Sequence, residues 1–171
     1  GERFSADYLD SSGVDFNPSE NLVGGKITLT YDALDNALFY TTMSRGYKTG
    51  GFNTDGTLDI DLRDFDSEGL INYELGFKGM PLDNRLQTQL ALFFMDRDDV
   101  QISSSLIRTR SDGSSEFIDY IGNAATGSNY GLEFTGNFQA SDRTIFYGSL
   151  GLLKTEYDDF INSAGDNLDG R

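Results

Sequence analysis

Cysteine, histidine and tryptophan are missing from this chain of 171 residues, and proline occurs only twice. Without cysteine or histidine the chain has no thiol nucleophile, no imidazole base and none of the usual zinc or haem ligands. Most catalytic constellations and transition-metal sites are therefore excluded. We expect a protein that is not an enzyme and that holds neither a cofactor nor a metal.

Positive charge is also scarce, because 13 Lys and Arg stand against 28 Asp and Glu, a formal net charge of −15. Such a field repels phosphates, so nucleic acid is not an expected partner. No stretch approaches the roughly 18 apolar residues of a membrane-spanning helix, and residues 1–20 lack a signal-peptide pattern. Any membrane span must then be made of strands, and the opening G-E-R-F-S indicates an internal piece of a longer chain.

Glycine and aromatic residues are plentiful, with 20 glycines and 13% aromatics, which favours β-structure. Several segments alternate apolar and polar residues with period two, the pattern of strands that have one apolar face. The apolar members are Ile27, Leu29 and Tyr31; Tyr73, Leu75 and Phe77; Leu86, Leu90, Leu92 and Phe94; and Tyr130, Leu132, Phe134 and Phe138. A soluble sandwich gives the same alternation, so strand length has to discriminate.

Residues 86–95 and 144–153 are charge-free runs of ten. A tilted strand needs about 9–11 residues to cross a bilayer, whereas strands of soluble domains have about 5–6. The links are asymmetric as well: those at 32–36, 80–84 and 139–143 are short, while 48–67, 103–126 and 157–171 are long and polar. Short turns at one rim and long loops at the other are typical of outer-membrane barrels. We therefore predict six antiparallel strands near 22–31, 37–47, 70–79, 85–102, 127–138 and 144–157, with a hairpin tip at 111–114.

Three motifs stand in order along the chain: Y-T-T-M-S-R-G-Y-K-T-G-G-F-N at 40–53, N-Y-E-L-G-F-K at 72–78 and A-L-F-F-M-D-R-D-D-V-Q at 91–101. Together they resemble the barrel domain of TonB-dependent outer-membrane receptors. The resemblance implies an all-β, up-and-down meander of about six strands within a transmembrane barrel of about 22 strands. Residues 1–171 show no plug domain, TonB box or C-terminal strand, so they are expected to be a partial barrel domain.

The resemblance also implies a function and its partners. The protein is expected in the outer membrane of a Gram-negative bacterium, in contact with membrane lipid and lipopolysaccharide. It would actively import a scarce nutrient, with a ferric siderophore or similar iron chelate as the leading candidate. The ligand would bind the loops and plug, and the inner-membrane TonB complex would pull the plug, without covalent chemistry.

Residue roles follow from the two faces. A mid-strand carboxylate facing lipid is costly, so Glu74 and Glu133, with Lys78, are predicted to face the lumen, as solvated wall or plug contacts in the first instance. The predicted lipid-facing residues are Tyr73, Leu75, Phe77, Leu90, Leu92, Tyr130, Leu132 and Phe134. Candidate ligand contacts at the extracellular mouth are Arg45, Tyr47, Lys48, Arg108 and Arg110, with rim structure as the alternative role for each.

Acidic residues cluster at 55–68 and 96–99, but neither cluster matches a calcium-binding loop, so both are predicted to be solvated surface. Two alternatives from other classes remain at this point. A passive porin or adhesin-type barrel would share the alternation and the asymmetry of the loops. A soluble β-sandwich binding module would bury Leu90 and Phe134 in a dry core.

Overall fold

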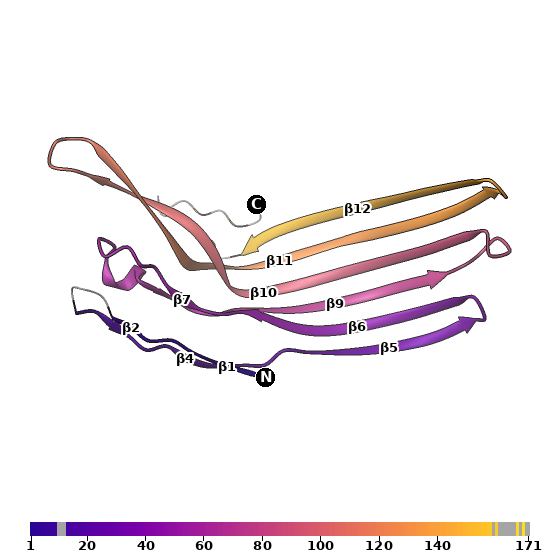
Figure 1. The fold of residues 1–171 in the computed structure, drawn as a ribbon, viewed down its shortest axis with the longest axis horizontal. Helices are drawn as coiled ribbons and strands as arrows, with labels where there is room; N and C mark the ends of the chain where they lie inside the picture. Colours follow the sequence, from indigo (N-terminus) through magenta and orange to yellow (C-terminus); the bar gives the residue numbers. More distant parts are fainter. Residues whose placement is uncertain (10–12, 159, 161–166, 168, 170–171) are drawn as a thin grey trace.

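The computed structural model describes residues 1–9, 13–158, 160, 167 and 169, and strands dominate it (Figure 1). Six long strands form one antiparallel sheet, which we call the wall, in the order β12-β11-β10-β9-β6-β5. Their bounds are Gly25–Leu34 (β5), Ala37–Lys48 (β6), Glu68–Gly79 (β9), Leu86–Thr109 (β10), Ser115–Ser141 (β11) and Thr144–Asp158 (β12). The predicted all-β meander of six wall strands is confirmed, and the wall does not close into a barrel within this chain.

The pairing register sorts the side chains of the wall into two faces. Leu90 lies opposite Phe77 on one side and Phe134 on the other, and the same parity continues outward to Phe39 and Leu150. Because side chains alternate along a strand, the apolar members of all six strands gather on one face. Two successive rows of this apolar face are Tyr31, Phe39, Phe77, Leu90, Phe134 and Leu150, and Leu29, Thr41, Leu75, Leu92, Leu132 and Leu152.

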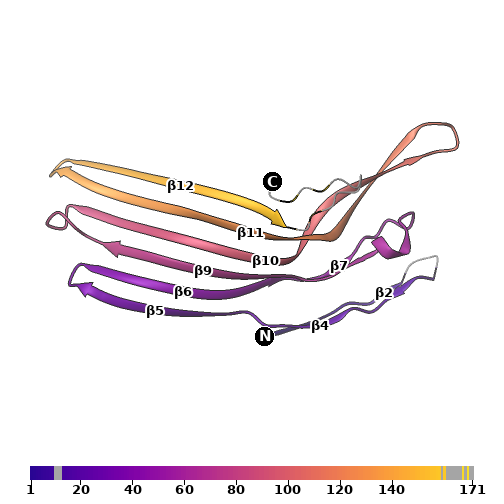
Figure 2. The same ribbon diagram turned by 180° about the vertical axis from the view of Figure 1, so that it is seen from behind.

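The wall is a single layer. Leu75 is 55% exposed and Leu152 is 58% exposed, and no described element covers the apolar face in either view (Figures 1 and 2). A β-sandwich would bury these residues against a second sheet. The alternative of a soluble sandwich with Phe134 in a dry core is therefore wrong, since Phe134 is 38% exposed.

The short turns lie together at one end of the wall, as predicted. Only Asp35 and Asn36 separate β5 from β6, and Met80 donates its backbone N–H to the carbonyl of Asn36 at 2.8 Å. Arg85 donates from Nε to the carbonyl of Gln139 at 3.0 Å and thereby ties the second turn to the third. These bonds link neighbouring turns into one rim.

The opposite end corrects one prediction. Residues 103–126 are not a long polar connection, because β10 continues to Thr109 and β11 begins at Ser115, so that the two strands project from the wall as a hairpin (Figure 1). The serines at 103–105 resemble a loop by composition, but the ladder is made by the backbone, and its register continues into the hairpin, where Leu106 pairs with Ile118. The predicted tip is confirmed by a 2.8 Å bond from the N–H of Arg110 to the carbonyl of Ser114.

Short elements that the sequence reading missed also lie at this end. No strand was predicted before residue 22, yet the chain forms an N-terminal hairpin there. Residues 49–67 contain a further pair of strands and a short 3-10 helix. Their bounds are Glu2–Ser5 (β1), Tyr8–Leu9 (β2), Asp15–Phe16 (β3), Ser19–Leu22 (β4), Gly51–Phe52 (β7), Ile60–Leu62 (η1) and Asp64–Phe65 (β8). The predicted loop at 157–171 falls mostly outside the described residues.

Burial divides the described chain into two regimes. The buried hydrophobic residues among those described are Leu58, Val100 and Ile118, and all three lie toward the end with the long connections. The wall has no core of its own, and its apolar face must be covered by something outside the chain. No helix in the described ranges is long and apolar enough to span a membrane.

Candidate functional site

The polar face of the wall carries the predicted lumen residues. Glu74, Lys78 and Glu133 all have the parity opposite to the apolar rows, and Glu133 shares a row with Tyr40 through Gly76 and Ala91. The structure thus places these three residues on one face, as predicted. Whether that face lines a lumen stays a prediction.

Tyr40 organises the centre of the polar face. Its hydroxyl donates to Oε1 of Glu74 at 2.6 Å, and Nζ of Lys78 lies 5.3 Å from the centroid of its ring. The ring also covers Gly76, where an added Cβ would lie only 2.1 Å from ring atoms. A cation, an aromatic ring and a carboxylate therefore occupy one small patch across β6 and β9, with Glu133 nearby.

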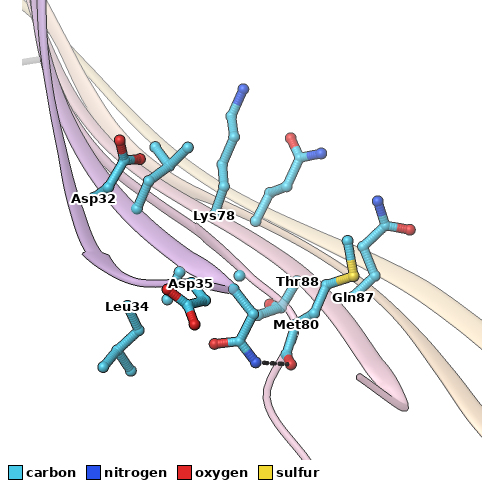
Figure 3. Close-up of a pocket in the computed structure, with 12 residues that line it drawn as sticks. Asp32, Leu34, Asp35, Lys78, Met80, Gln87 and Thr88 are labelled. Carbon is cyan, nitrogen blue, oxygen red and sulfur yellow. Dashed lines mark hydrogen bonds between the residues drawn. The ribbon is translucent and has the colours of Figure 1, made fainter. Parts of the chain in front are cut away.

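A hollow of mixed polar and apolar lining lies beside this patch, toward the short-turn rim (Figure 3). It is a cavity of about 270 Å³ whose lining includes Asp32, Lys78 and Gln87. Figure 3 shows the side chain of Lys78 extending away from the strands. At the rim, Nδ2 of Asn36 donates to the carbonyl of Met80 at 2.8 Å. The hollow offers charged and amide groups to whatever lies against the polar face.

Two carboxamide oxygens on the polar face lack a hydrogen-bond donor within the described part of the chain. Oδ1 of Asn72 and Oδ1 of Asn129 are buried without a hydrogen bond among the described residues, and both side chains flank Met95 in register. A buried acceptor without a donor costs about 1–3 kcal/mol. This row is therefore suited to accept hydrogen bonds from groups outside the described chain.

The mouth, by which we mean residues 45–70 and 97–127, contains three of the predicted ligand contacts that do not share one face. Lys48 pairs in register with Glu68 and has the polar parity, whereas Arg45 and Tyr47 share the parity of the apolar face. Tyr47 donates its hydroxyl to Oε2 of Glu2 at 2.9 Å. Arg45 and Lys48 are exposed, so of the three residues Lys48 alone combines exposure with the polar face.

The other two predicted ligand contacts already have partners on the projecting hairpin. Arg108 donates from Nη1 to the carbonyl of Thr57 at 2.6 Å. Arg110 donates to Glu116 at 2.8 Å, and this bond holds the pKa of Glu116 below its ordinary value. A ligand at either guanidinium would have to share or displace these bonds.

A buried ion pair at the base of the mouth was missed by the sequence reading. Glu68 was assigned to a solvated acidic loop, yet its side chain is only 7% exposed and its Oε1 accepts from Nε and Nη2 of Arg97, at 2.8 and 2.5 Å. Its Oε2 accepts the backbone N–H of Gln101 at 3.0 Å. The sequence spacing of Glu68, Arg97 and Gln101 does not predict these bonds. The bulge at Asp99, with φ of 53°, brings the N–H of Gln101 to the carboxylate.

The remaining acidic side chains of the mouth do not form a metal site. No group of three or more Asp or Glu side chains in the described ranges is arranged to hold a metal ion. Asp55, for example, accepts from the backbone and hydroxyl of Thr57, and these bonds lower the pKa of Asp55. Its role is to shape the local turn.

The predicted lipid-facing residues all lie on the apolar face. Tyr73, Phe94 and Tyr130 form an aromatic row at the mouth end of the apolar face, and this row ends at Lys154, whose Nζ is 5.6 Å from the Tyr130 centroid. The next row toward the mouth contains Arg45, Asp96 and Glu156. Charge therefore begins where the aromatic row ends.

Comparison with known proteins agrees with this geometry. A family model described as TonB dependent receptor-like, beta-barrel, matches residues 2–171. The Pesticin receptor of Yersinia pestis is 33% identical over 90 residues, which make up 53% of this chain and 13% of that protein. The Pesticin receptor of Yersinia enterocolitica is 34% identical over 86 residues, covering 50% of this chain and 12% of that protein. The matches thus span only a small part of the length of these relatives.

Solved structures share the fold at lower identity. The ferric yersiniabactin uptake receptor FyuA of Yersinia pestis superposes with a TM-score of 0.68 at 21% identity, over 88% of this chain and 22% of that one. The ferric-catecholate import receptor Fiu of E. coli K12 superposes with a TM-score of 0.60 at 16% identity, over 96% of this chain and 25% of that one. The alcaligin outer-membrane receptor FauA of Bordetella pertussis superposes with a TM-score of 0.55 at 18% identity, over 92% of this chain and 26% of that one.

The family model covers nearly the whole chain, and the wall has the single layer, the two faces and the asymmetric ends of an outer-membrane barrel. Members of this family are receptors and transporters of the Gram-negative outer membrane. The chain belongs to the TonB-dependent receptor β-barrel family and forms part of such an outer-membrane barrel.

Proposed function

We propose that the chain is one sector of an outer-membrane receptor that imports a ferric siderophore or similar iron chelate. The observation that carries the proposal is the one-layer, two-faced wall in a chain of the TonB-dependent receptor family. The names of similar proteins support the cargo, since FyuA and Fiu are titled as receptors for ferric yersiniabactin uptake and ferric-catecholate import. Transport involves no covalent step, so no residue is given a catalytic role.

The apolar face is proposed to contact membrane lipid, with lipopolysaccharide on the side of the mouth. Eight residue steps separate Leu86 from Phe94 along β10, which at about 3.4 Å per residue is roughly 27 Å. A tilt of about 40° reduces this to roughly 21 Å, close to the apolar band of about 25 Å in outer-membrane barrels. Both boundaries carry aromatic residues, Phe138 and Phe146 at one end and Tyr73 and Tyr130 at the other.

The polar face is proposed to line a lumen that holds a plug domain outside residues 1–171, which would make this chain a partial barrel domain. Glu74, Lys78 and Glu133 supply charge to that lumen, and Asn72 and Asn129 supply acceptors that lack donors among the described residues. The TonB complex would act on the plug and not on the wall. Energy coupling therefore lies outside this sector.

Cargo contacts are proposed for the mouth at Arg45, Tyr47, Lys48, Arg108 and Arg110. Lys48 has the strongest structural support, because it is exposed at the mouth end of the polar face. Arg108 and Arg110 would contribute if cargo shared or displaced their bonds to the carbonyl of Thr57 and the carboxylate of Glu116.

Uptake measurements in iron-limited cells test the proposal. Deletion of the full-length gene should abolish uptake of radiolabelled iron supplied as the cognate ferric siderophore, and a plasmid copy should restore it. Uptake should also stop in a strain without TonB. Uptake that survives loss of TonB would support the passive porin instead, and normal iron uptake in the deletion strain across a panel of siderophores would refute the iron-chelate cargo.

A further inference from the structure

Residues 49–67 form a closed loop, which we call the strap. Gln101 ties its two ends, because Nε2 donates to the carbonyl of Thr49 at 2.9 Å and to that of Asp66 at 3.0 Å. The backbone N–H of Gly50 also donates to Oγ of Ser67 at 2.9 Å. A loop closed at its base and packed by its own side chains is compact and ordered.

The strap is joined to the β10–β11 hairpin by two asparagines that imitate strand pairing. Nδ2 of Asn53 donates to the carbonyl of Ile121 at 2.8 Å, and Oδ1 of Asn53 accepts the N–H of Ile121 at 2.8 Å. Asn123 makes the reciprocal arrangement, since its Oδ1 accepts the N–H of Asp66 at 2.6 Å and its Nδ2 donates to the carbonyl of Asp66 at 3.0 Å. Each carboxamide satisfies both polar groups of one residue's backbone.

The strap is also joined to the N-terminal hairpin through Arg63, which is 2% exposed. Arg63 donates from Nε to the carbonyl of Asn53 at 3.1 Å and from Nη2 to the hydroxyl of Tyr8 at 2.9 Å. The ring of Tyr8 lies 4.8 Å from that of Phe52. A continuous chain of contacts therefore runs from Ile121 through Asn53 and Arg63 to Tyr8.

We infer that the strap, the β10–β11 hairpin and the N-terminal hairpin form one preassembled unit at the mouth, with Asn53, Asn123 and Gln101 as the residues that position it. The cohesion of the unit comes from side-chain bonds that it makes itself, together with the buried Leu58 and Ile118. It is therefore ordered before any cargo binds and moves as one body. The inference does not depend on which cargo the receptor carries.

Hydrogen–deuterium exchange on the full-length, cargo-free receptor in lipid nanodiscs tests this inference. In the wild type, peptides covering 49–67 and 117–123 should exchange at least tenfold more slowly than unstructured chain. Asn53→Ala should accelerate exchange at least tenfold in these peptides and also in the N-terminal hairpin at 2–9 and 13–22, to which Asn53 is linked through Arg63 and Tyr8. The wall peptides 71–78 and 130–138 should not change.

The neighbouring exposed Thr54→Ala is the matched control and should leave all peptides as in the wild type. Gln101→Ala is the second variant: it opens the base of the strap from the opposite side and should give the same coupled acceleration, so it decides the matter if Asn53→Ala fails to assemble. Acceleration confined to 117–123, or a wild-type strap that exchanges as fast as unstructured chain, would overturn the inference.

Discussion

The ring of Tyr40 covers Gly76 on the neighbouring strand so closely that a methyl group at that glycine would overlap the ring, at 2.1 Å from Cε1 and Cζ. Its hydroxyl reaches past the glycine to Glu74 at 2.6 Å. The absence of a side chain at Gly76 is therefore what allows the ring to lie flat and the hydrogen bond to form. Aromatic cover of a strand glycine also stabilises the sheet, because glycine has no side chain to pack.

Gly76→Ala should displace Tyr40 and break its bond to Glu74. We expect a loss of about 1–3 kcal/mol, the usual cost of overpacking, measured by urea unfolding of the full-length receptor in lipid. Gly151→Ala is the control, because Gly151 occupies the same row of the polar face and an added Cβ there meets nothing within 4 Å. If the two substitutions lowered the free energy of unfolding equally, the contact between Tyr40 and Gly76 would not be the cause of the loss.

Leu90→Arg tests the apolar face. Near the bilayer midplane an arginine on the lipid side costs about 2–4 kcal/mol of barrel stability, which the same unfolding experiment would detect. Thr135→Arg introduces the same charge on the polar face, beside the Leu90 partner Phe134, and should cost much less, because Thr135 is exposed and pairs with the uncharged Gln89 and Ser149. Should the two variants be equally stable, the lipid-facing assignment of Leu90 would be wrong.

Glu133→Gln tests the polar face from the opposite direction. The carboxylate is exposed on the polar face, so its neutralisation should change stability by less than about 0.5 kcal/mol. Unfolding in lipid provides the measurement. A large stabilisation would instead indicate that the charge had been held against hydrocarbon.

Arg97→Ala tests the ion pair at the base of the mouth. The substitution removes both guanidinium bonds from the buried Glu68 but keeps the bond from the N–H of Gln101, and loss of hydrogen bonds to a charged group costs about 1.5–3 kcal/mol. The expected result is faster amide exchange at 66–70 and 97–102, with little change at the short-turn rim. Arg143→Ala, an exposed position on that rim, should leave the mouth unaffected. If Arg97→Ala did not alter exchange, Glu68 would have to be neutral or otherwise solvated.

The pair of Arg110 and Glu116 predicts the response of the hairpin tip to acid. The hydrogen bond from Arg110 lowers the folded pKa of Glu116 from its ordinary value of 4.5. The pair thus stabilises the tip above that ordinary value and loses this contribution as the pH falls through the folded pKa. An NMR titration of labelled glutamate in the full-length receptor should give a midpoint below 4.5, and Arg110→Gln should raise it. A midpoint that does not respond to the substitution would contradict the pairing.

The wall was largely predictable because its information is local. Tyr73, Leu75 and Phe77 alternate with polar residues, and the short turn after Gly79 sets the register with β10, so period and turn length together decide which side chains share a face. The six wall strands, the short-turn rim and the polar placement of Glu74 follow from this. The family resemblance rests on the same segments.

The mouth was less predictable because its contacts join residues that are distant in sequence. Asn53 bonds to Ile121, which is 68 positions away in the sequence, and Arg63 bonds to Tyr8, which is 55 positions away. Asn53 ends the motif at 40–53 that resembles the receptor family, but an asparagine is also common in solvated turns, so the motif does not predict its bonds to Ile121. Composition also misassigned residues 103–126, since serine-rich strands look like loops.

By itself the sequence determined that this protein is a wall of strands with one apolar and one polar face. Alternation and turn length are local properties of neighbouring residues, so they can be recognised without knowing the tertiary contacts. Only the tertiary structure decided how the mouth is held, because carboxamides, a buried guanidinium and a carboxylate acquire their roles from the backbone groups that folding brings to them. Glu68 shows the difference, because in the sequence it is one of several acidic residues and in the fold it is the buried partner of Arg97.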